Sequence, residues 1–456
     1  MNVPYISWSS TMVPAHAGIA AGYQGMKILA LTAGASGMYC GTCLRDNALA
    51  AELSRQGHDV ILLPLYTPTR TDEANVSHPR VFFNGISIYL QQNWPLLRRL
   101  PPIVFRFLES GWLLRLATSR SVPVDPKLLG ELTVAMLQGR DGALRREFDT
   151  LTLWLSTQQA PGIVDIPHTL LIALARPLKE LLGCPVVCTL QGEDLFLGGL
   201  IEPYRSQALS LIAEGGRHVD AFIASSEYYA EFMSRFLSIP ASKIRVVPLG
   251  INLRGHAPVR SGGGVFRAGY MARIAPEKGL HLLVDAWRLL RQDKDLGPGR
   301  LEVAGYLPPA NRGYLREAER TMQRHGLAGE FIYHGEVDRA EKIRFLQRLD
   351  VLSVPSTCDE PKGIFVLEAL ANGVPVVQPR RGAYPEVLAR TGGGLLVEPD
   401  SAAALAGALR TLWLDAALRR RLGDEGCAAV REHHSIERMA KATAAVYGSL
   451  TGAARV

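Results

Sequence analysis

The chain has 456 residues, enough for two or three domains that each bury a core. Hydrophobic residues make up 47% and charged residues 20%, a composition typical of globular proteins and not of disordered or fibrous ones. The formal charge of +7 suits an anionic ligand but is spread too thinly for a dedicated nucleic-acid-binding protein, and no apolar run predicts a transmembrane helix.

Strand-like sequence begins only at Met26, in MKILALTAG. Residues 1–25 have neither the basic start nor the continuous apolar stretch of a signal peptide, so we expect a cytoplasmic chain with a loose N-terminal extension. Residues 26–66 contain a strand, a glycine loop, a helical pattern closed by Gly57 and a second strand. This order predicts a βαβ unit with parallel strands.

The alternation of short apolar strands and helical patterns continues and predicts two domains. We expect a first domain over 26–255, with a helical insertion at about 93–160, and a second domain over 262–434. A linker rich in Pro, Ser and Gly separates them, and a C-terminal helix over 435–450 packs back on the first domain or elsewhere. The sequence therefore predicts an α/β protein of two doubly wound, Rossmann-like domains facing each other across a cleft.

Two cysteine pairs leave alternatives open. Cys40 and Cys43 form a Cys-x-x-Cys motif near a βαβ unit, where a helix N-terminus lowers the pKa of the first thiol and the second sulfur resolves a mixed disulfide. Cys184 and Cys188 lie four apart in a predicted strand, so they face one way and could complete a four-sulfur zinc site with the first pair. The third interpretation is packing of small side chains in a tight loop and a buried strand.

In the second domain, two basic residues share one strand-to-helix loop. Arg273 follows a predicted strand, and Lys278 lies five residues later across a turn that ends at Gly279. A guanidinium fork and a mobile ammonium suit a diphosphate, which Arg contacts with two hydrogen bonds and Lys as a point charge. A solvated basic loop is the alternative interpretation of this stretch alone.

The stretch STCDEPKGIFVLEALANGVPVV predicts a loop, an apolar helix and a strand, and further along the chain GGGLLV predicts a glycine-rich turn. Glu360 precedes the helix, and Glu368 lies on its apolar face, where a carboxylate needs a partner. Ribose hydroxyls would supply that partner, and an ion pair with a neighbouring helix is the alternative. The free N–H groups of Gly363, Ile364 and Phe365 predict an anion site at the helix start, beside the two basic residues.

Together these stretches resemble glycosyltransferase family 4, the retaining nucleotide-sugar transferases of GT-B fold. The motifs that carry the resemblance are Arg273-x4-Lys278-Gly279, Glu360-x7-Glu368, ALANGVPVV and GGGLLVEPDSAAALAGAL. It extends from Met26 to about Leu450 and is looser in the first half. The resemblance implies a GT-B fold and an enzyme of the hexosyltransferase class, which moves a sugar from a nucleotide diphosphate to an acceptor without a metal or other cofactor.

The resemblance also implies roles for residues of the second domain, which would bind the donor. Arg273 and Lys278 would hold the diphosphate and offset the charge of the leaving group. Glu360 would contact the hydroxyls of the donor sugar, and Glu368 those of the ribose. Backbone amides from Gly363 to Phe365 would cradle phosphate and sugar.

In the first domain, which would face the acceptor, the resemblance marks a loop and a histidine. Gly34 and Gly37 lie where the family's first loop approaches the donor diphosphate and the acceptor, and CGTC continues that loop. His168, after a predicted strand, is similar to a histidine that faces the sugar, although a structural histidine is the alternative. Such enzymes run front-face substitution in which the departing phosphate oxygen helps to deprotonate the acceptor, so no separate base is expected.

Three positions depart from the family's pattern. Lys362 replaces a common Phe, Ala272 replaces a Gly before the Arg, and Gln191 replaces a frequent His. They leave the donor undefined and keep open a GT-B relative without transferase activity, such as an epimerase, a phosphorylase or a non-catalytic nucleotide-sugar-binding protein.

Two further stretches concern metals and membranes. Asp293 and Asp295 form an Asp-x-Asp that ends a predicted helix, so we interpret them as solvated charge and expect no metal site. Residues 93–120 carry five Arg, one Glu and interleaved aromatic residues, which suits peripheral contact with the inner face of a membrane and a lipid-linked or cell-envelope acceptor. The alternative is an insertion of packed helices whose Arg side chains face water.

Overall fold

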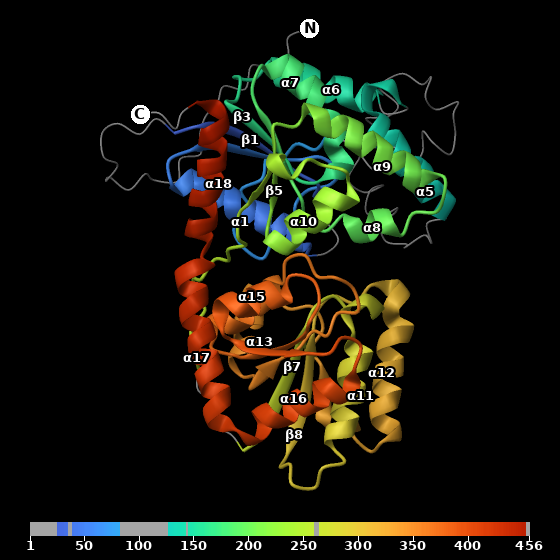
Figure 1. The fold of residues 1–456 in the computed structure, drawn as a ribbon, viewed down its shortest axis with the longest axis vertical. Coiled ribbons are helices and arrows are strands. Elements are labelled where there is room, and N and C mark those ends of the chain that lie inside the picture. The colour runs from blue at the N-terminus through green and yellow to red at the C-terminus, as the bar shows by residue number, and fades with distance from the viewer. Residues whose placement is uncertain (1–24, 35–38, 83–125, 143–144, 260–263, 453–456) are drawn as a thin grey trace.

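The computed structural model describes residues 25–34, 39–82, 126–142, 145–259 and 264–452. They form two lobes, drawn one above the other in Figure 1. The predicted extension before Met26, Gly37 and the basic stretch 93–120 lie outside the described residues.

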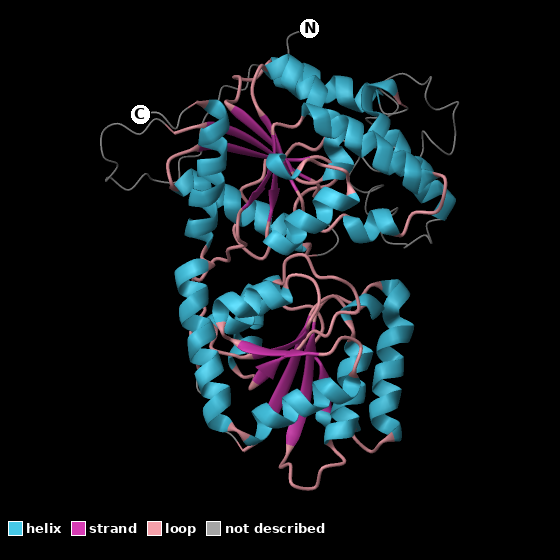
Figure 2. Cartoon of the chain, in the orientation of Figure 1, coloured by secondary structure: helices cyan, strands magenta, loops and turns pink. Residues whose placement is uncertain are grey.

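The first lobe is built on a parallel six-stranded sheet of order β2-β1-β3-β4-β5-β6. Its strands are β1 (Lys27–Thr32), β2 (Asp59–Pro64), β3 (Ile163–Ile166), β4 (Val186–Thr189), β5 (Ala221–Ala224) and β6 (Ile244–Val246). Its helices are α1 (Gly41–Arg55), α5 (Pro126–Gln138), α6 (Arg145–Ser156), α7 (Ala175–Leu182), α8 (Asp194–Gly198), α9 (Tyr204–Gly215) and α10 (Glu227–Phe236). The continuous apolar runs of these strands are typical of parallel sheets covered on both faces by helices, as Figure 2 shows.

The second lobe has a second parallel sheet, of order β12-β11-β10-β7-β8-β9. Its strands are β7 (Phe266–Met271), β8 (Gly299–Ala304), β9 (Phe331–Tyr333), β10 (Val351–Leu352), β11 (Val376–Pro379) and β12 (Gly394–Val397). Its helices are α11 (Leu280–Leu290), α12 (Arg312–Arg324), α13 (Arg339–Gln347), α14 (Ile364–Ala371), α15 (Tyr384–Thr391), α16 (Ala402–Leu414) and α17 (Ala416–His433). Two parallel six-stranded sheets flanked by helices confirm the predicted pair of Rossmann-like units.

The strand orders fix where a ligand crevice forms. In the first sheet the order reverses between β1 and β3, and in the second between β7 and β10. Ligands of open α/β sheets bind at such switch points, outside the carboxyl ends of the strands. The Cys-x-x-Cys motif at the start of α1 follows β1, the two basic residues follow β7 and the first carboxylate follows β10, so the topology brings the predicted site segments together.

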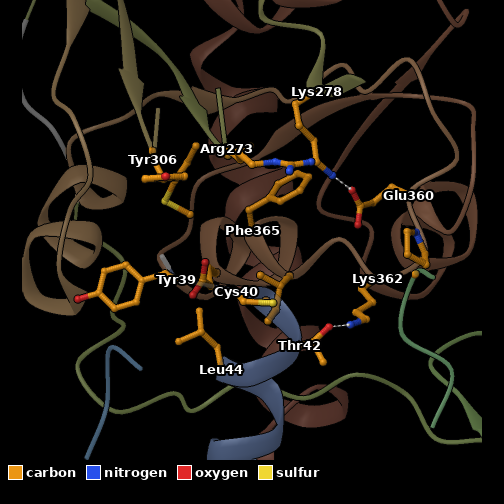
Figure 3. Close-up of a pocket in the computed structure, with 18 of the residues that line it drawn as sticks. Tyr39, Cys40, Thr42, Leu44, Arg273, Lys278, Tyr306, Glu360, Lys362 and Phe365 are labelled. Atoms are coloured by element: carbon orange, nitrogen blue, oxygen red, sulfur yellow. Dashed lines mark hydrogen bonds and ion pairs between the residues drawn. The ribbon is translucent and has the colours of Figure 1, made fainter. Parts of the chain in front are cut away.

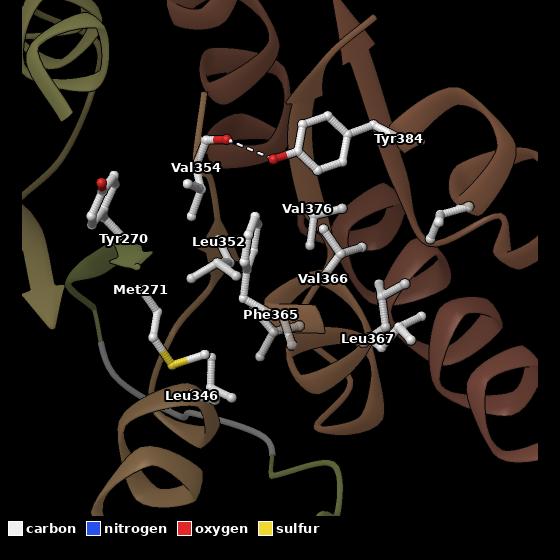
Figure 4. Close-up of a cluster of buried hydrophobic side chains, with 14 of the residues drawn as sticks. Tyr270, Met271, Leu346, Leu352, Val354, Phe365, Val366, Leu367, Val376 and Tyr384 are labelled. Carbon is white, nitrogen blue, oxygen red and sulfur yellow. Dashed lines mark hydrogen bonds between the residues drawn. The ribbon is translucent and has the colours of Figure 1, made fainter. Parts of the chain in front are cut away.

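A buried apolar cluster supports the second switch point. Figure 4 shows side chains of β7, α13, α14 and α15 packed around Leu352 of β10. Phe365 and Val366, in the first turn of α14, belong to this cluster and are 8% and 0% exposed. The start of α14 is therefore held by core packing, which keeps its free N–H groups in a defined position.

The C-terminal helices connect the lobes. α17 lies against the second lobe, and α18 (Ile436–Thr451) packs on α1 of the first, as Figure 1 shows. Tyr447 of α18 donates a hydrogen bond from its hydroxyl to the buried Oδ2 of Asp165, at 2.6 Å. In the described part of the chain, no helix combines the length and apolarity needed to cross a bilayer.

Two local expectations were wrong, and one of the alternatives for the cysteines does not form. Cys40 is the N-cap of α1, and Cys43 lies in the first turn of that helix instead of in a loop. The stretch GGGLLV, interpreted as a glycine-rich turn, contains strand β12. Cys184 and Cys188 do not join the first pair, because the described residues contain no group of three or more His, Cys, Asp or Glu side chains that could hold a metal ion.

Candidate functional site

A cavity of about 450 Å³ lies between the two lobes, at the facing carboxyl ends of the sheets. From the first lobe it is lined by residues 39–42 and Leu44 at the start of α1 and by the loop after β4. From the second lobe it is lined by the loops after β7 and β10 and by α14. Figure 3 shows side chains from both lobes pointing into the same space.

The loop after β7 holds Arg273 and Lys278 on the wall of the cavity, as predicted. A short 3₁₀ turn ends at Lys278, and Gly279 follows with φ of +73°. A Cβ on Gly279 would lie 1.9 Å from the carbonyl oxygen of Pro355, so only glycine fits there. The Arg273 guanidinium pairs with Glu277 on its own loop.

Glu360 faces Lys278 across the cavity wall, with 2.5 Å between Oε2 and Nζ. The Glu360 side chain is buried, and its Oε1 accepts a hydrogen bond from the N–H of Gly363 at 3.4 Å. Burial by itself would raise the pKa of Glu360, but the Lys278 ammonium outweighs it and holds that pKa below its ordinary value. The carboxylate therefore stays charged at neutral pH and can accept hydrogen bonds from hydroxyl groups.

The start of α14 is the predicted anion site. Gly363 is its N-cap, with φ of +64°, and directs the chain into the helix. Within the described residues, no hydrogen-bond acceptor is recorded for the N–H groups of Ile364 and Phe365, and both residues line the cavity. These two groups, together with Lys278 and Arg273, converge on one side of the cavity and favour an anion there.

Glu368 lines the cavity, but its carboxylate is paired with Lys342 of α13, at 2.6 Å. The alternative interpretation of Glu368, an ion pair with a neighbouring helix, thus describes the observed contact. The Lys342 ammonium also contacts Asp72 of the first lobe, at 2.6 Å. Burial raises the pKa of Glu368 despite the ammonium beside it.

Lys362 crosses the cavity to the first lobe. Its Nζ donates hydrogen bonds to Thr42 Oγ1 at 3.2 Å and to Gln191 Oε1 at 2.8 Å. Burial, together with the charge on Arg45, lowers the pKa of Lys362 to about 8. The two departures from the family's pattern at positions 191 and 362 are therefore one hydrogen-bonded pair that joins the lobes.

Two of the predicted first-lobe residues, His168 and Gly34, are described, and neither lies on the cavity wall. Burial lowers the pKa of His168 to about 4, and its Nδ1 has no hydrogen-bond partner in the described structure. A Cβ on Gly34 would lie 1.7 Å from the carbonyl oxygen of Thr67, which explains the glycine by close packing.

Several residues that line the cavity were not predicted from the sequence. Asp72, Lys342 and Tyr306 line the cavity from three separate segments. Lys342 lies in an ordinary amphipathic helix, and Asp72 lies in a polar loop, so neither has a local signal. The only signal in the sequence was that Glu368 needed a cationic partner.

Comparisons with known proteins agree with this geometry. Residues 258–428 match the family model described as Glycosyl transferases group 1, and residues 45–250 match that of the Glycosyl transferase 4-like domain. The chain is 31% identical over 192 residues to the phosphatidyl-myo-inositol mannosyltransferase of Mycobacterium leprae, covering 41% of this chain and 49% of that one. It is 30% identical to the D-inositol 3-phosphate glycosyltransferase of Pseudarthrobacter chlorophenolicus, covering 57% and 63%. The chain thus spans between about half and two thirds of the length of these curated relatives.

Solved structures show the same architecture over almost the whole chain. A sucrose-phosphate synthase from Thermosynechococcus elongatus superposes with a TM-score of 0.69 at 19% identity, covering 94% of this chain and 99% of that one. HepE from Anabaena, in complex with UDP and glucose, superposes with a TM-score of 0.65 at 17% identity, covering 93% and 100%.

Proposed function

Because this chain belongs to glycosyltransferase family 4 and has the GT-B fold, we propose that it transfers a sugar from a nucleotide diphosphate donor to an acceptor. The observation that carries the proposal is the convergence of Arg273, Lys278 and the start of α14 on one cavity between the lobes. Two cations and free backbone N–H groups favour a diphosphate over a neutral ligand or a cation.

In this proposal the donor diphosphate lies against Arg273, Lys278 and the amides of α14. As the bond between sugar and phosphate breaks, negative charge grows on the leaving phosphate, and preorganised cations in a water-poor cavity stabilise it most at that point. Lys278 keeps Glu360 ionised, so this carboxylate accepts hydrogen bonds from sugar hydroxyls and orients the ring. We also propose that the anomeric carbon keeps its configuration during transfer, and NMR of the product checks this.

Glu368 is proposed to bind the ribose, which requires a change of partner. Its carboxylate is held by Lys342, and a ribose would replace or share that ion pair. Lys342 would keep its ion pair with Asp72, and the ribose hydroxyls would donate hydrogen bonds to the Glu368 carboxylate, which reduces the cost of its buried charge.

We also propose that the reaction needs no metal and that the acceptor is lipid-linked or part of a cell-envelope glycan. The cations of the second lobe supply the charge compensation that a divalent metal would otherwise provide. The acceptor class is supported by the names of relatives, among them a phosphatidyl-myo-inositol mannosyltransferase and a lipopolysaccharide core mannosyltransferase from Rhizobium leguminosarum.

The test is calorimetric titration of the full chain with UDP, GDP, ADP and their sugars, in the presence of EDTA. We expect one base to bind, and its nucleotide sugar to be cleaved with release of the nucleoside diphosphate. Arg273→Gln should weaken binding about 10- to 100-fold, because a hydrogen bond to a charged group contributes roughly 1.5–3 kcal/mol. Glu360→Gln should reduce turnover more than binding, since it acts on the sugar.

Arg316→Gln is the matched control, because Arg316 is exposed on α12 and does not line the cavity. It should bind and turn over the donor as the unchanged protein does. Absence of binding for every nucleotide, with a folded protein, would contradict the donor site. Binding without cleavage in the presence of acceptor extracts would favour the non-catalytic GT-B relative.

A further inference from the structure

The Cys-x-x-Cys motif lies on the wall of the cavity, in a setting that the transferase proposal does not use. Cys40 is the N-cap of α1, a helix of 15 residues, and lines the cavity. Cys43, three residues later, is fully buried behind it. Side chains at the N-cap and at the third helical position lie on the same side of the first turn, so the two thiols are neighbours. One thiol is therefore accessible from the cavity, and its neighbour is shielded.

The surroundings of Cys40 favour a thiolate. The thiol of Cys43, the backbone N–H of Cys43 and the charge on Lys362 together lower the pKa of Cys40 to about 5, against the opposing effect of burial. The same contact and burial raise the pKa of Cys43. Figure 3 shows Cys40, Thr42 and Lys362 close together where the helix begins. A helix N-terminus and a nearby ammonium are the features that activate cysteines in thiol chemistry.

The remaining cysteines are unlike this pair. Cys358 also lines the cavity, but burial raises its pKa. Cys184, Cys188 and Cys427 are buried. Cys358 is thus a natural comparison for Cys40, since it shares the same cavity but lacks the helix N-terminus and a second thiol.

We propose that Cys40 and Cys43 form a thiol–disulfide exchange site that opens into the cleft, with a low-molecular-weight disulfide as its co-substrate. The Cys40 thiolate attacks one sulfur of the small disulfide, forming a mixed disulfide as the original bond breaks and one thiolate leaves. The first released thiolate takes the proton of Cys43, and the Cys43 sulfur attacks the Cys40 sulfur, forming the bond between Cys40 and Cys43 and releasing the second thiolate. Two electrons pass from the cysteine pair to the small disulfide, which leaves as one thiol and one thiolate that takes a proton from solvent.

This exchange is reversible, so excess thiol returns the pair to its reduced form. Oxidation also removes the Cys40 negative charge beside Lys362, which changes the electrostatics of the cavity wall. The inference does not rest on the proposed transferase activity, because the exchange needs neither donor nor acceptor.

The experiment incubates the full-length protein with buffers of varied ratios of oxidised to reduced glutathione, followed by acid quenching and mass spectrometry of tryptic peptides. The peptide 28–45 contains Cys40 and Cys43 and no other cysteine. We expect it to lose two hydrogens as the buffer becomes oxidising and to regain them in excess thiol. Iodoacetamide at mildly acidic pH should modify Cys40 faster than Cys358, by a factor of about 10 or more, since the thiolate is the reactive form.

Two serine variants separate the roles of the thiols. Cys43→Ser should accumulate a glutathione adduct on Cys40, because no resolving thiol remains. Cys40→Ser should form neither adduct nor internal disulfide, and Cys358→Ser should behave as the unchanged protein does. Equal alkylation rates for Cys40 and Cys358, or no internal disulfide in the unchanged protein at any glutathione ratio, would overturn the proposal whether or not the variants fold.

Discussion

Lys362 joins the two lobes by hydrogen bonds, but burying its ammonium costs free energy. Its ammonium makes hydrogen bonds to two neutral groups of the first lobe, and no carboxylate of the described structure forms an ion pair with it. Transferring a charge from water into a partly buried cavity disfavours the charged form, and the nearby charge on Arg45 adds to this effect, which is why the pKa of Lys362 falls to about 8. The folded chain therefore tolerates this ammonium at neutral pH and gains no net stability from it.

The first prediction concerns the pH dependence of stability at Lys362. The unfolded chain holds this proton up to about pH 10.5, whereas the folded chain releases it at about 8. Between these values the unfolded state binds more protons, so the free energy of unfolding should rise with pH, by at most about 3 kcal/mol. Lys362→Met should lack this rise. The measurement is the free energy of unfolding by urea at about pH 7 and about pH 9.5. Its change between these pH values is compared between Lys362→Met and a control variant.

Lys441→Met supplies that control, because Lys441 is exposed on α18 and its ammonium is therefore hydrated in the folded chain. It should keep the rise of the unchanged protein. If Lys362→Met and Lys441→Met show the same pH dependence, then the ammonium of Lys362 is solvated and the interpretation of its environment is wrong.

At the scale of elements, the position of Lys278 on the cavity wall depends on one sharp turn after β7. The 3₁₀ turn Pro276–Lys278 ends at Gly279, and α11 begins at the next residue. Gly279 passes close to the Pro355 carbonyl, and the N–H of Thr357 donates to the carbonyl of Glu277, so the loop after β7 and the loop after β10 are in backbone contact. Lys278 and Glu360 belong to these two loops, so the contact sets the separation of the ion pair that we place under the donor.

The second prediction tests this turn with two glycines of similar conformation. Gly279→Ala adds a Cβ that meets the Pro355 carbonyl at 1.9 Å, whereas a Cβ added to Gly326, with φ of +72°, would have nothing within 4 Å. Gly326→Ala should cost only the backbone strain, about 1–2 kcal/mol in unfolding free energy. Gly279→Ala should lower the unfolding free energy by more than Gly326→Ala does. It should also weaken nucleotide binding, because the loops after β7 and β10 must move apart. Denaturant midpoints and calorimetric titration measure both effects.

Equal destabilisation of these two alanine variants would contradict the prediction. So would normal nucleotide affinity in Gly279→Ala, since the close approach would then be irrelevant to the positions of Lys278 and Glu360.

Sequence patterns predicted most strands because parallel strands in covered sheets are continuous apolar runs bounded by turn residues. They failed where local signals conflicted. Three glycines before LLV indicated a turn, yet the last of them begins β12, where pairing with β11 overrides propensity. The CGTC segment has no N-cap side chain that bonds the helix, so the start of α1 was placed too late.

Some residues of the candidate site could likewise be predicted from the sequence, and others could not. Arg273, Lys278 and Glu360 were predictable because each follows a strand at a switch point, and topology alone brings such loops together. The contact of Lys342 with Asp72 joins residues 270 positions apart, and no local pattern encodes it. The position of His168 away from the cavity wall depends on the depth of the β3 loop, which a motif does not specify.

At the scale of the whole molecule, the lobes are joined by two kinds of contact. The chain crosses between them twice, and the crossings are paired, since the N–H of Ile251 donates to the carbonyl of His434 and that of Ile436 donates to the carbonyl of Ile251. One apolar cluster continues from the second lobe through α18 to the side of α1. The two chain crossings and this apolar cluster therefore hold the lobes together permanently, and the lobes can rotate about this connection.

The contacts across the cleft itself are polar. Arg339 pairs with Glu73 at 3.1 Å, and Arg70 pairs with Glu336 at 3.4 Å. On the other side, the carboxylate of Glu386 accepts hydrogen bonds from the first two N–H groups of α10. Interfaces of this kind resemble transient contacts between proteins, so we expect the cleft to open and close during donor exchange.

The third prediction is that ionic strength controls this opening. Raising salt from about 0.01 M to about 1 M shortens the screening length from roughly 30 Å to roughly 3 Å, which weakens the ion pairs across the cleft, most of all the more exposed pair of Arg70 and Glu336. For a chain of this length the compact radius of gyration is about 22 Å, and partial opening should raise it by on the order of 1 Å in small-angle X-ray scattering. The triple variant Asp72→Asn, Glu73→Gln, Glu386→Gln should already be expanded at low salt and respond less, since three of the carboxylates that bridge the lobes are gone.

Glu317→Gln is the control, because Glu317 pairs only with Arg320 and Arg324 of its own helix among the contacts of the described chain. It should keep both the compact radius and the salt response. The same nucleotide that binds in calorimetry should restore the compact radius of the unchanged protein at high salt, since a ligand in a cavity lined by residues of both lobes favours the closed arrangement. A radius that is identical in all variants and at all salt concentrations would show that the apolar connection through α18, and not the charges across the cleft, fixes the relative position of the lobes.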